Sequence, residues 1–157
     1  LINHLIGTAA LLAQWGAPSE LQDAGLYHAA YGTAGFNESL VSTDKRGDIA
    51  EIIGIEAEEI VYQYCACDRK YFFPQFEATQ DPIFKNRFTG ELYSLSPKSL
   101  NIFCELTAAN EIEVAIDNPS FIAEHGKGLA SLFASMSRYL SKDALAKVAK
   151  VFGINNA

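Results

Sequence analysis

The chain has 157 residues, of which 49% are hydrophobic and 20% charged, a composition that excludes a disordered chain and suits one globular domain. Its formal net charge of −7, with scattered lysines and arginines, argues against a nucleic-acid partner, which needs clustered basic residues. The cysteines are odd in number, which indicates reduced thiols, and the sequence shows neither a bilayer-spanning apolar run nor an export signal. We therefore expect a cytoplasmic protein with no nucleic-acid and no membrane partner.

The first part of the chain predicts two helices and a turn. The sequence starts without Met inside a run of helical spacing, so we expect a further segment upstream. Apolar spacing predicts helices over 1–15 and over Pro18–Tyr31. His28 points the same way as the apolar residues of the second helix, and a glycine-rich turn over 31–35 follows it. An inward imidazole beside such a turn favours a pocket.

The middle of the chain is predicted to become irregular. After a polar loop over 36–43, helices are expected over 43–54 and 56–69. Residues 70–96 are rich in Phe and Tyr but have no clear period, and Pro and Gly interrupt them. We interpret this segment as an ordered, aromatic-rich flap, with a β-hairpin over 84–92 as one option, because long segments without period are often functional.

The most regular helix is predicted over Pro97–Asp117, with Ser96 as its N-cap. One face of this helix is mostly apolar, but Glu111 lies in its middle and Asn110 at its edge. A carboxylate buried there must be partnered, protonated or metal-bound, because an isolated buried charge is too costly. The acidic residues expected on the opposite side are Glu105, Glu113 and Asp117.

The last part of the chain predicts two more helices. Asn118-Pro119 ends the preceding helix, and a glycine-flanked turn over 124–128 is expected to expose His125. Apolar spacing predicts helices over 129–139 and 141–153, the second capped by Ser and stopped by Gly. The whole chain is thus expected to be one all-α domain.

Three of the predicted helices could bring His4, His28 and Glu111 together, with Asn110 beside them. Two imidazoles and one carboxylate can bind a divalent metal, or can act as general acid and base on a substrate. The alternative for each histidine is a core residue whose nitrogens bond to backbone carbonyls. A carboxylate on an apolar face shifts the balance toward a functional pocket.

Further polar side chains are candidates for ligand contacts. Tyr31 and Thr33 could hold a polar group beside the imidazole, or their turn could be a glycine-assisted helix stop. Asp68 and Arg69 could line the same cavity, or could form a solvated pair at a helix end. Arg87, in the aromatic segment, is a candidate clamp for a phosphate or carboxylate.

Several motifs resemble known families. An early His, a second His at the end of AGLYHA and a helix pair ending in CDRK resemble the HD superfamily, in particular the hydrolase half of the (p)ppGpp synthetase/hydrolases. His4–Phe36 is more closely similar to the family called domain of unknown function 6817, whose pattern is HLxGT…LLxxWGAP…LxxAGLxHxxYGTxGF, with ANE at 109–111. The resemblance implies a compact, multi-helix, HD-domain-like bundle over 1–157, with 70–96 as its irregular flap.

Departures from the HD pattern limit what it implies. Ala29 stands where the superfamily has a metal-bridging Asp, and the later metal Asp would fall at Thr107–Ala109. Because these expected ligands are missing, a dinuclear centre is not expected. The resemblance implies at most one divalent metal, Fe, Mn or Zn, held by His4, His28 and Glu111, or no metal at all.

Two functions follow from these residues. The first is a divergent, hydrolase-like HD enzyme acting on a small polar molecule, such as a phosphorylated or nucleotide-like one. In that enzyme His28 is general base or ligand, His4 is its partner, and Glu111 is the acid or third ligand. The alternative is a non-catalytic small-molecule-binding or regulatory domain that has lost the metal centre. The retained ionisable residues favour the enzyme, and a homodimer is left open.

Overall fold

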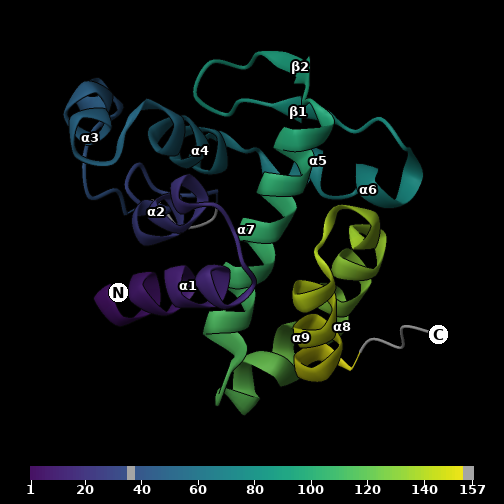
Figure 1. Ribbon diagram of the computed structural model, residues 1–157. Coiled ribbons are helices and arrows are strands. Elements are labelled where there is room, and N and C mark those ends of the chain that lie inside the picture. Colours follow the sequence, from purple (N-terminus) through teal and green to yellow (C-terminus); the bar gives the residue numbers. More distant parts are fainter. Residues whose placement is uncertain (35–37, 154–157) are drawn as a thin grey trace.

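The computed structural model describes residues 1–34 and 38–153. Helix α7 (Pro97–Ala115) runs through the middle of the molecule, and the other long helices pack on either side of it (Figure 1). On one side lie α1 (Ile2–Gln14), α2 (Ser19–Tyr27), α3 (Arg46–Ile53) and α4 (Ile55–Ala66). On the other side lie α8 (Pro119–Ser135) and α9 (Lys142–Phe152).

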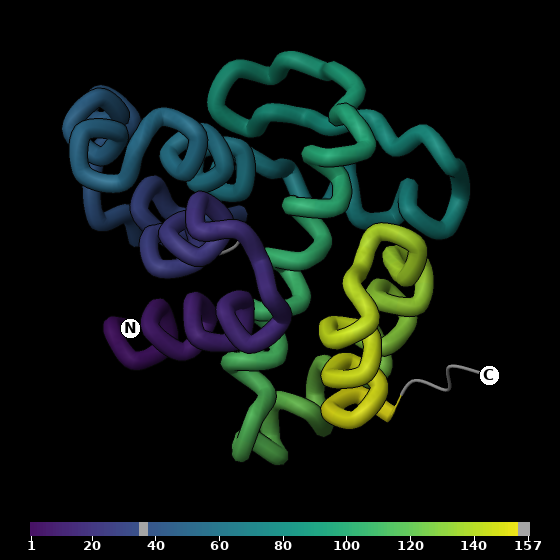
Figure 2. Tube along the Cα trace, viewed as in Figure 1, coloured from purple at the N-terminus to yellow at the C-terminus, as the bar shows by residue number. Residues whose placement is uncertain are grey.

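Short elements complete the chain, which Figure 2 traces from the N-terminal helices, up through residues 69–95, to the C-terminal pair. They are two single-turn helices, two 3₁₀ helices and two strands: α5 (Arg69–Phe72), α6 (Gln75–Ala78), η1 (Thr43–Lys45), η2 (Ser137–Tyr139), β1 (Ile83–Lys85) and β2 (Leu92–Ser94). The prediction of a mostly helical protein is confirmed. Among the helices that the structure describes, none combines the length and apolarity needed to cross a membrane.

The helix ends follow local signals in the sequence. Ser96, Asn118 and Ser141 each accept a hydrogen bond from a backbone N–H of the helix they begin, α7, α8 and α9 respectively. Gly153 ends α9 with a φ of 72°, a left-handed conformation that favours glycine. These caps explain why the bounds of α7 and α9 lie close to the predicted ones.

The second predicted helix is shorter than expected. It ends at Tyr27, with His28 as its C-cap, and turns follow over 28–31. The described part of the glycine-rich turn ends at Ala34, so Gly35 and positions 36–37 of the predicted polar loop lie outside the described residues. The predicted helix over 43–54 is observed as the 3₁₀ helix η1, whose N-cap is Ser42, followed by α3, and the predicted helix over 56–69 corresponds to α4.

Residues 70–96 contain more regular structure than predicted. Two single-turn helices precede an antiparallel pair of strands in which Ile83 faces Ser94 and Lys85 faces Leu92. Phe72 and Phe84 are fully buried, with ring centroids 5.3 Å apart, and both pack near Phe103 of α7. The segment is therefore part of the core, and the expectation of an irregular flap is not confirmed.

The predicted turn at 124–128 is wrong, because α8 runs through it without a break. Each glycine in a helix costs about 1 kcal/mol relative to Ala, but the strong start at Asn118-Pro119 and the apolar contacts of the helix outweigh that cost. His125 is exposed as expected, with half of its side chain accessible, but it lies on a helix and its ring centroid is 4.9 Å from that of Phe121.

Helix α7 is buried on almost every side, since other helices flank it on both sides. The main apolar cluster of buried residues extends from Leu11 of α1 to Val148 of α9 and includes seven residues of α7. Glu105, predicted on a polar face, is 8% exposed and accepts hydrogen bonds from the backbone N (3.0 Å) and Oγ (2.6 Å) of Ser141. That carboxylate therefore fixes the start of α9 against α7.

Candidate functional site

A partly buried polar cluster joins α1 to the C-terminal half of α7. Nδ1 of His4 lies 2.8 Å from Oε1 of Glu113, and Nε2 of the same ring lies 2.8 Å from Oδ1 of Asn110. Nδ2 of Asn110 donates to the hydroxyl of Tyr64 in α4 over 2.9 Å. Both ring nitrogens of His4 therefore have a partner, and the ring is held in one orientation.

His28 lies against this cluster, at the end of α2. Its ring centroid is 5.1 Å from that of His4 and 5.8 Å from that of Tyr64, both in edge-to-face geometry. Nδ1 lies 2.7 Å from the carbonyl oxygen of Gly25, so Nδ1 carries the proton and Nε2 is left as an acceptor. Burial lowers the pKa of His28 to about 4, which makes the ring neutral at pH 7.

Glu111 does not complete a triad with the two histidines. Its Oε1 lies 3.9 Å from Nη1 of Arg69, and burial raises the pKa of this carboxyl, although the nearby guanidinium opposes that shift. The carboxylate that contacts His4 is Glu113, which the sequence placed on the opposite, polar side of the helix. That placement was wrong because α7 packs against neighbours on both sides and has no fully polar face.

Arg69, the first residue of α5, is largely buried, with 20% of its side chain exposed. Its guanidinium carbon lies 5.3 Å from the ring centroid of Tyr64 and 5.8 Å from that of Phe73. Nε and Nη2 are closed to solvent and have no hydrogen-bond partner among residues 1–34 and 38–153. A buried guanidinium with two unpartnered nitrogens is energetically costly.

Asp68 and Arg69 do not form the solvated pair considered above. Oδ1 of Asp68 accepts a hydrogen bond from the backbone N–H of Tyr71 and so caps α5. Oδ2 of Asp68 lies 3.9 Å from Nζ of Lys85. The aspartate is therefore used by its own helix and by β1, while the arginine points into the interior.

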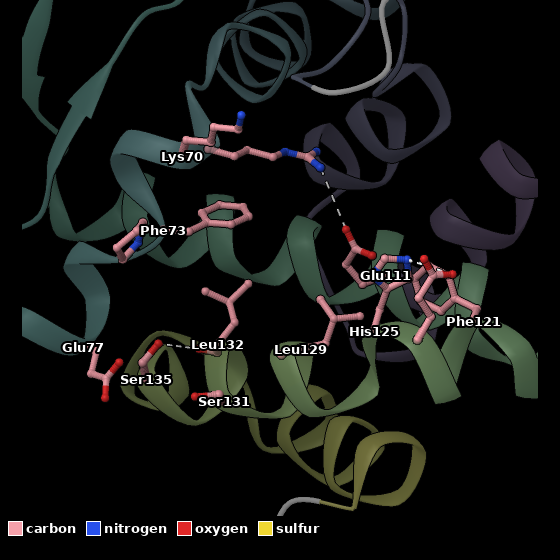
Figure 3. A pocket seen from close by; sticks show the side chains of 14 residues that line it. Lys70, Phe73, Glu77, Glu111, Phe121, His125, Leu129, Ser131, Leu132 and Ser135 are labelled. Atoms are coloured by element: carbon pink, nitrogen blue, oxygen red, sulfur yellow. Dashed lines mark hydrogen bonds and ion pairs between the residues drawn. The ribbon is translucent and has the colours of Figure 1, made fainter.

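Arg69 and Glu111 line a cavity of about 750 Å³ between α5 and α6 on one side and α8 on the other, with α7 at its end. Figure 3 shows Phe73, Leu129 and Leu132 around its middle. Glu111 and His125 lie toward one end and Glu77 toward the other. The described residues that line this cavity do not include either His4 or His28, so the polar cluster lies behind the wall that Arg69 and Glu111 form.

Three other predicted ligand contacts lie elsewhere. The hydroxyl of Tyr31 donates to Oε2 of Glu58 over 3.3 Å, and burial raises the pKa of this tyrosine to about 12. Thr33 is buried as well. Nε of Arg87 donates to the backbone oxygen of Cys65 over 2.8 Å, so this side chain joins the hairpin to α4. In the described structure these residues are not among those that line the cavity.

The donor atoms do not fit the single-metal centre that the resemblance implied. Within residues 1–34 and 38–153, no three His, Cys, Asp or Glu side chains gather closely enough to hold a metal ion. Both nitrogens of His4 are engaged, Nδ1 of His28 faces a carbonyl oxygen, and Glu111 turns toward Arg69.

The sequence analysis did not identify Glu113 or the apolar residues of α8 as part of this region. Two residue spacings in the sequence could have indicated them. Asn110 and Glu113 are three positions apart on a helix, so they share a face and can reach the same partner. Phe121, Leu129 and Leu132 share a face only if residues 119–135 are read as one continuous helix. The predicted turn at 124–128 hid this second spacing.

The comparisons with known proteins concern the N-terminal part of the chain. The family model described as Domain of unknown function (DUF6817) matches residues 1–69, which include His4, His28, Tyr64 and Arg69. No curated protein and no solved structure matches the chain. None of these findings supports the resemblance to the HD superfamily. The part of the chain that is similar to the DUF6817 family thus supplies both histidines of the polar cluster and the largely buried Arg69.

Proposed function

We propose that the protein is a small-molecule-binding domain whose ligand carries an anionic group, a carboxylate or a phosphate, that Arg69 binds. The observation that carries this proposal is the guanidinium of Arg69, which borders a cavity of about 750 Å³ while Nε and Nη2 lack partners among the described residues. Cavities of this size are typical of small-molecule sites. The ligand would supply the hydrogen-bond acceptors that Nε and Nη2 lack.

The chemistry of arginine supports an acid as the bound group. A guanidinium presents its N–H groups as a planar fork that matches a carboxylate or a phosphate, and it stays charged when buried. Glu111 is a poor substitute, because 3.9 Å is too long for a hydrogen bond to Nη1. Since Nε and Nη2 are closed to solvent, binding requires the guanidinium to turn toward the cavity that its side chain already lines.

The environment of the histidines favours binding over catalysis. His4 has both nitrogens occupied, and His28 is 2% exposed and lies behind the cavity wall. A group with a pKa of about 4 is a weak base at pH 7, although it can accept a hydrogen bond. We assign these residues to positioning α1, α2 and α7 around the cavity.

A divergent HD-like hydrolase is the second candidate, and one observation favours it. With Nδ1–H directed to Gly25, the neutral ring of His28 keeps Nε2 as an acceptor, which is the form that a general base requires. In this case the substrate is a small polar molecule, such as a phosphorylated or nucleotide-like one, and must pass between Arg69 and Glu111 to reach the imidazole.

Replacing Arg69 tests the binding proposal. We would titrate the wild type with acetate, inorganic phosphate and adenosine monophosphate, and follow the thermal unfolding midpoint and the heat of binding. At least one of these probes should raise the midpoint of the wild type, and Arg69→Met should abolish the effect because the charged fork is lost. The matched control is Lys142→Met, which removes the same charge from an exposed side chain of α9 that does not line the cavity, and it should leave binding unchanged.

Further measurements on the same samples separate the alternatives. Without ligand, Arg69→Met should unfold at nearly the same denaturant concentration as the wild type, because the variant removes two unpartnered buried N–H groups but also leaves Glu111 without the cation 3.9 Å away, and these two effects oppose each other. Equal binding by Arg69→Met and the wild type, or a large loss of stability in the variant, would contradict the proposal. Mass spectrometry of each probe after incubation distinguishes the candidates, since only an enzyme converts the probe to product.

A further inference from the structure

We infer that the ligand is an amphiphilic carboxylic acid, whose acid group binds Arg69 and whose apolar body lies between α5–α6 and α8. This inference rests on the proposed function and names the class of ligand that the cavity takes. It follows from how the apolar and charged side chains are distributed along the cavity.

The two long walls of the cavity are apolar where they face each other. Phe73 and Pro74 line the α5–α6 wall, and Leu129 and Leu132 line the α8 wall (Figure 3). Phe73, Leu129 and Leu132 are all half-buried although they pack against the main core. An apolar body placed between these walls would remove their remaining exposed surface from water, which is favourable.

The middle of the cavity offers few polar groups: Ser131 and Ser135 add hydroxyls on the α8 side, and Oγ of Ser135 already donates to the carbonyl oxygen of Leu132. The side chains of Phe73, Leu129 and Leu132 offer neither donors nor acceptors to a sugar or a nucleobase. The polar groups of a nucleotide placed there would lose hydrogen bonds to water without replacement, which is unfavourable. The middle of the cavity therefore suits an alkyl chain or an aromatic ring.

The charges around the cavity favour one negative charge on the ligand. Among the described residues that line the cavity, Arg69 and Lys70 are basic, whereas Glu77, Glu111 and Glu124 are acidic. A dianionic phosphate monoester would face three carboxylates with two cations nearby, whereas a carboxylate brings a single charge. Burial raises the pKa of Glu111, so this side chain can take up a proton when a second carboxylate approaches Arg69.

Four probes of related structure test this inference by isothermal titration calorimetry, below their aggregation concentrations. They are decanoate, acetate, 1-decanol and decyl phosphate. Decanoate should bind at least ten-fold more tightly than acetate, which has the acid without the body, and than 1-decanol, which has the body without the acid. It should also bind more tightly than decyl phosphate. Arg69→Met should reduce the affinity for decanoate to that of the alcohol.

A cavity-filling variant tests the location. Gly128 lies on α8 at the cavity, and a Cβ added there has no heavy atom within 4 Å, so Gly128→Leu can fill the space without disturbing the fold. It should weaken decanoate binding at least ten-fold. Gly47→Leu is the matched control, because Gly47 is equally open, lies on α3 away from the cavity and should leave binding unchanged.

The outcomes distinguish this inference from the proposed function. If acetate, phosphate or adenosine monophosphate binds through Arg69 and decanoate binds no more tightly than acetate, the proposed function holds and the amphiphile inference is wrong. If none of the acids binds in a way that depends on Arg69, both are wrong. Decanoate binding that Gly128→Leu leaves unchanged would also overturn the inference, because the apolar body would then lie elsewhere.

Discussion

His28 shows how one buried side chain links the acidity of the solvent to stability. Its pKa is about 4 in the folded protein and 6.5 as a free side chain, because burial disfavours the charged ring. The unfolded chain therefore takes up this proton first as the pH falls. The stability that neutral His28 contributes is fully present above pH 6.5 and is lost as the pH falls toward 4, by roughly 3 kcal/mol in total.

Urea unfolding of the wild type and of His28→Asn at several pH values between 7.5 and 4 measures this loss. The asparagine keeps a polar group near the carbonyl of Gly25 but cannot titrate. The free energy of unfolding should fall more steeply with acid in the wild type than in the variant, and the two curves should converge at low pH. Parallel curves would mean that His28 titrates alike in the folded and unfolded states.

At the scale of elements, the contact between α1 and α2 depends on a residue without a side chain. A Cβ on Gly25 would lie 2.7 Å from Cδ1 of Leu12 and 3.4 Å from Cα of Ala9. The second of these is an ordinary van der Waals contact, whereas the first is too short and requires the side chain of Leu12 to move. Leu12 is fully buried in the main apolar cluster, so this movement disturbs the packing between α1 and α2.

Gly25→Ala should therefore destabilise the protein by about 1–3 kcal/mol, as overpacked cores do. Gly47→Ala is its control, since Gly47 also lies in a helix but has open space around it. That change should stabilise the protein by about 0.5–1 kcal/mol through helix propensity alone. Chemical unfolding measures both values, and equal effects at the two positions would refute the close contact between the helices.

Elements whose ends are set by neighbouring residues could be predicted from the sequence, whereas elements that depend on tertiary contacts could not. Ser96-Pro97 and Gly153 act within a few residues, and the helix bounds they predicted are nearly correct. The glycines at 126 and 128 predicted a turn by the same local logic, and tertiary packing of α8 overrode them. The caps thus predicted most of the helices, whereas the course of α8 depended on contacts elsewhere in the fold.

The candidate site divides in the same way. The inward direction of His28 follows from helical spacing, and so does the position of Asn110 beside Glu111. The pairing of His4 with Glu113 depends on which face of α7 meets α1, and a single sequence does not contain that choice. Arg69 looked like a surface residue because it stands beside an aspartate and a lysine, and the packing of α5 against Tyr64 is what buries it.

At the scale of the whole molecule, the thiols report on global opening. Cys65, Cys67 and Cys104 are fully buried near the centre of the fold, and burial raises the pKa of Cys65 to about 11 and that of Cys67 to about 12. Thiols react as thiolates, so both burial and the raised pKa values suppress their reaction.

Ellman's reagent should therefore react very slowly with the native protein at pH 8. Its rate should rise with urea in parallel with the fraction unfolded, which circular dichroism measures independently. Rapid reaction of one thiol in the absence of denaturant would show that the end of α4 opens separately from the rest of the fold.

The contact between His4 and Glu113 also has a kinetic consequence. These residues are 109 positions apart in the chain, whereas α1 also packs against α2, the next helix in sequence. Closing so long a loop costs conformational entropy before the contact between α1 and α7 stabilises the fold, so α1 is expected to dock on α7 late, after the folding barrier has been crossed. Substitutions at His4 would then speed unfolding and leave the folding rate unchanged. Helix α1 would thus be the last element to dock on α7 and the first to detach from it. Each detachment would briefly expose Tyr64 and Asn110 to molecules that the closed fold excludes.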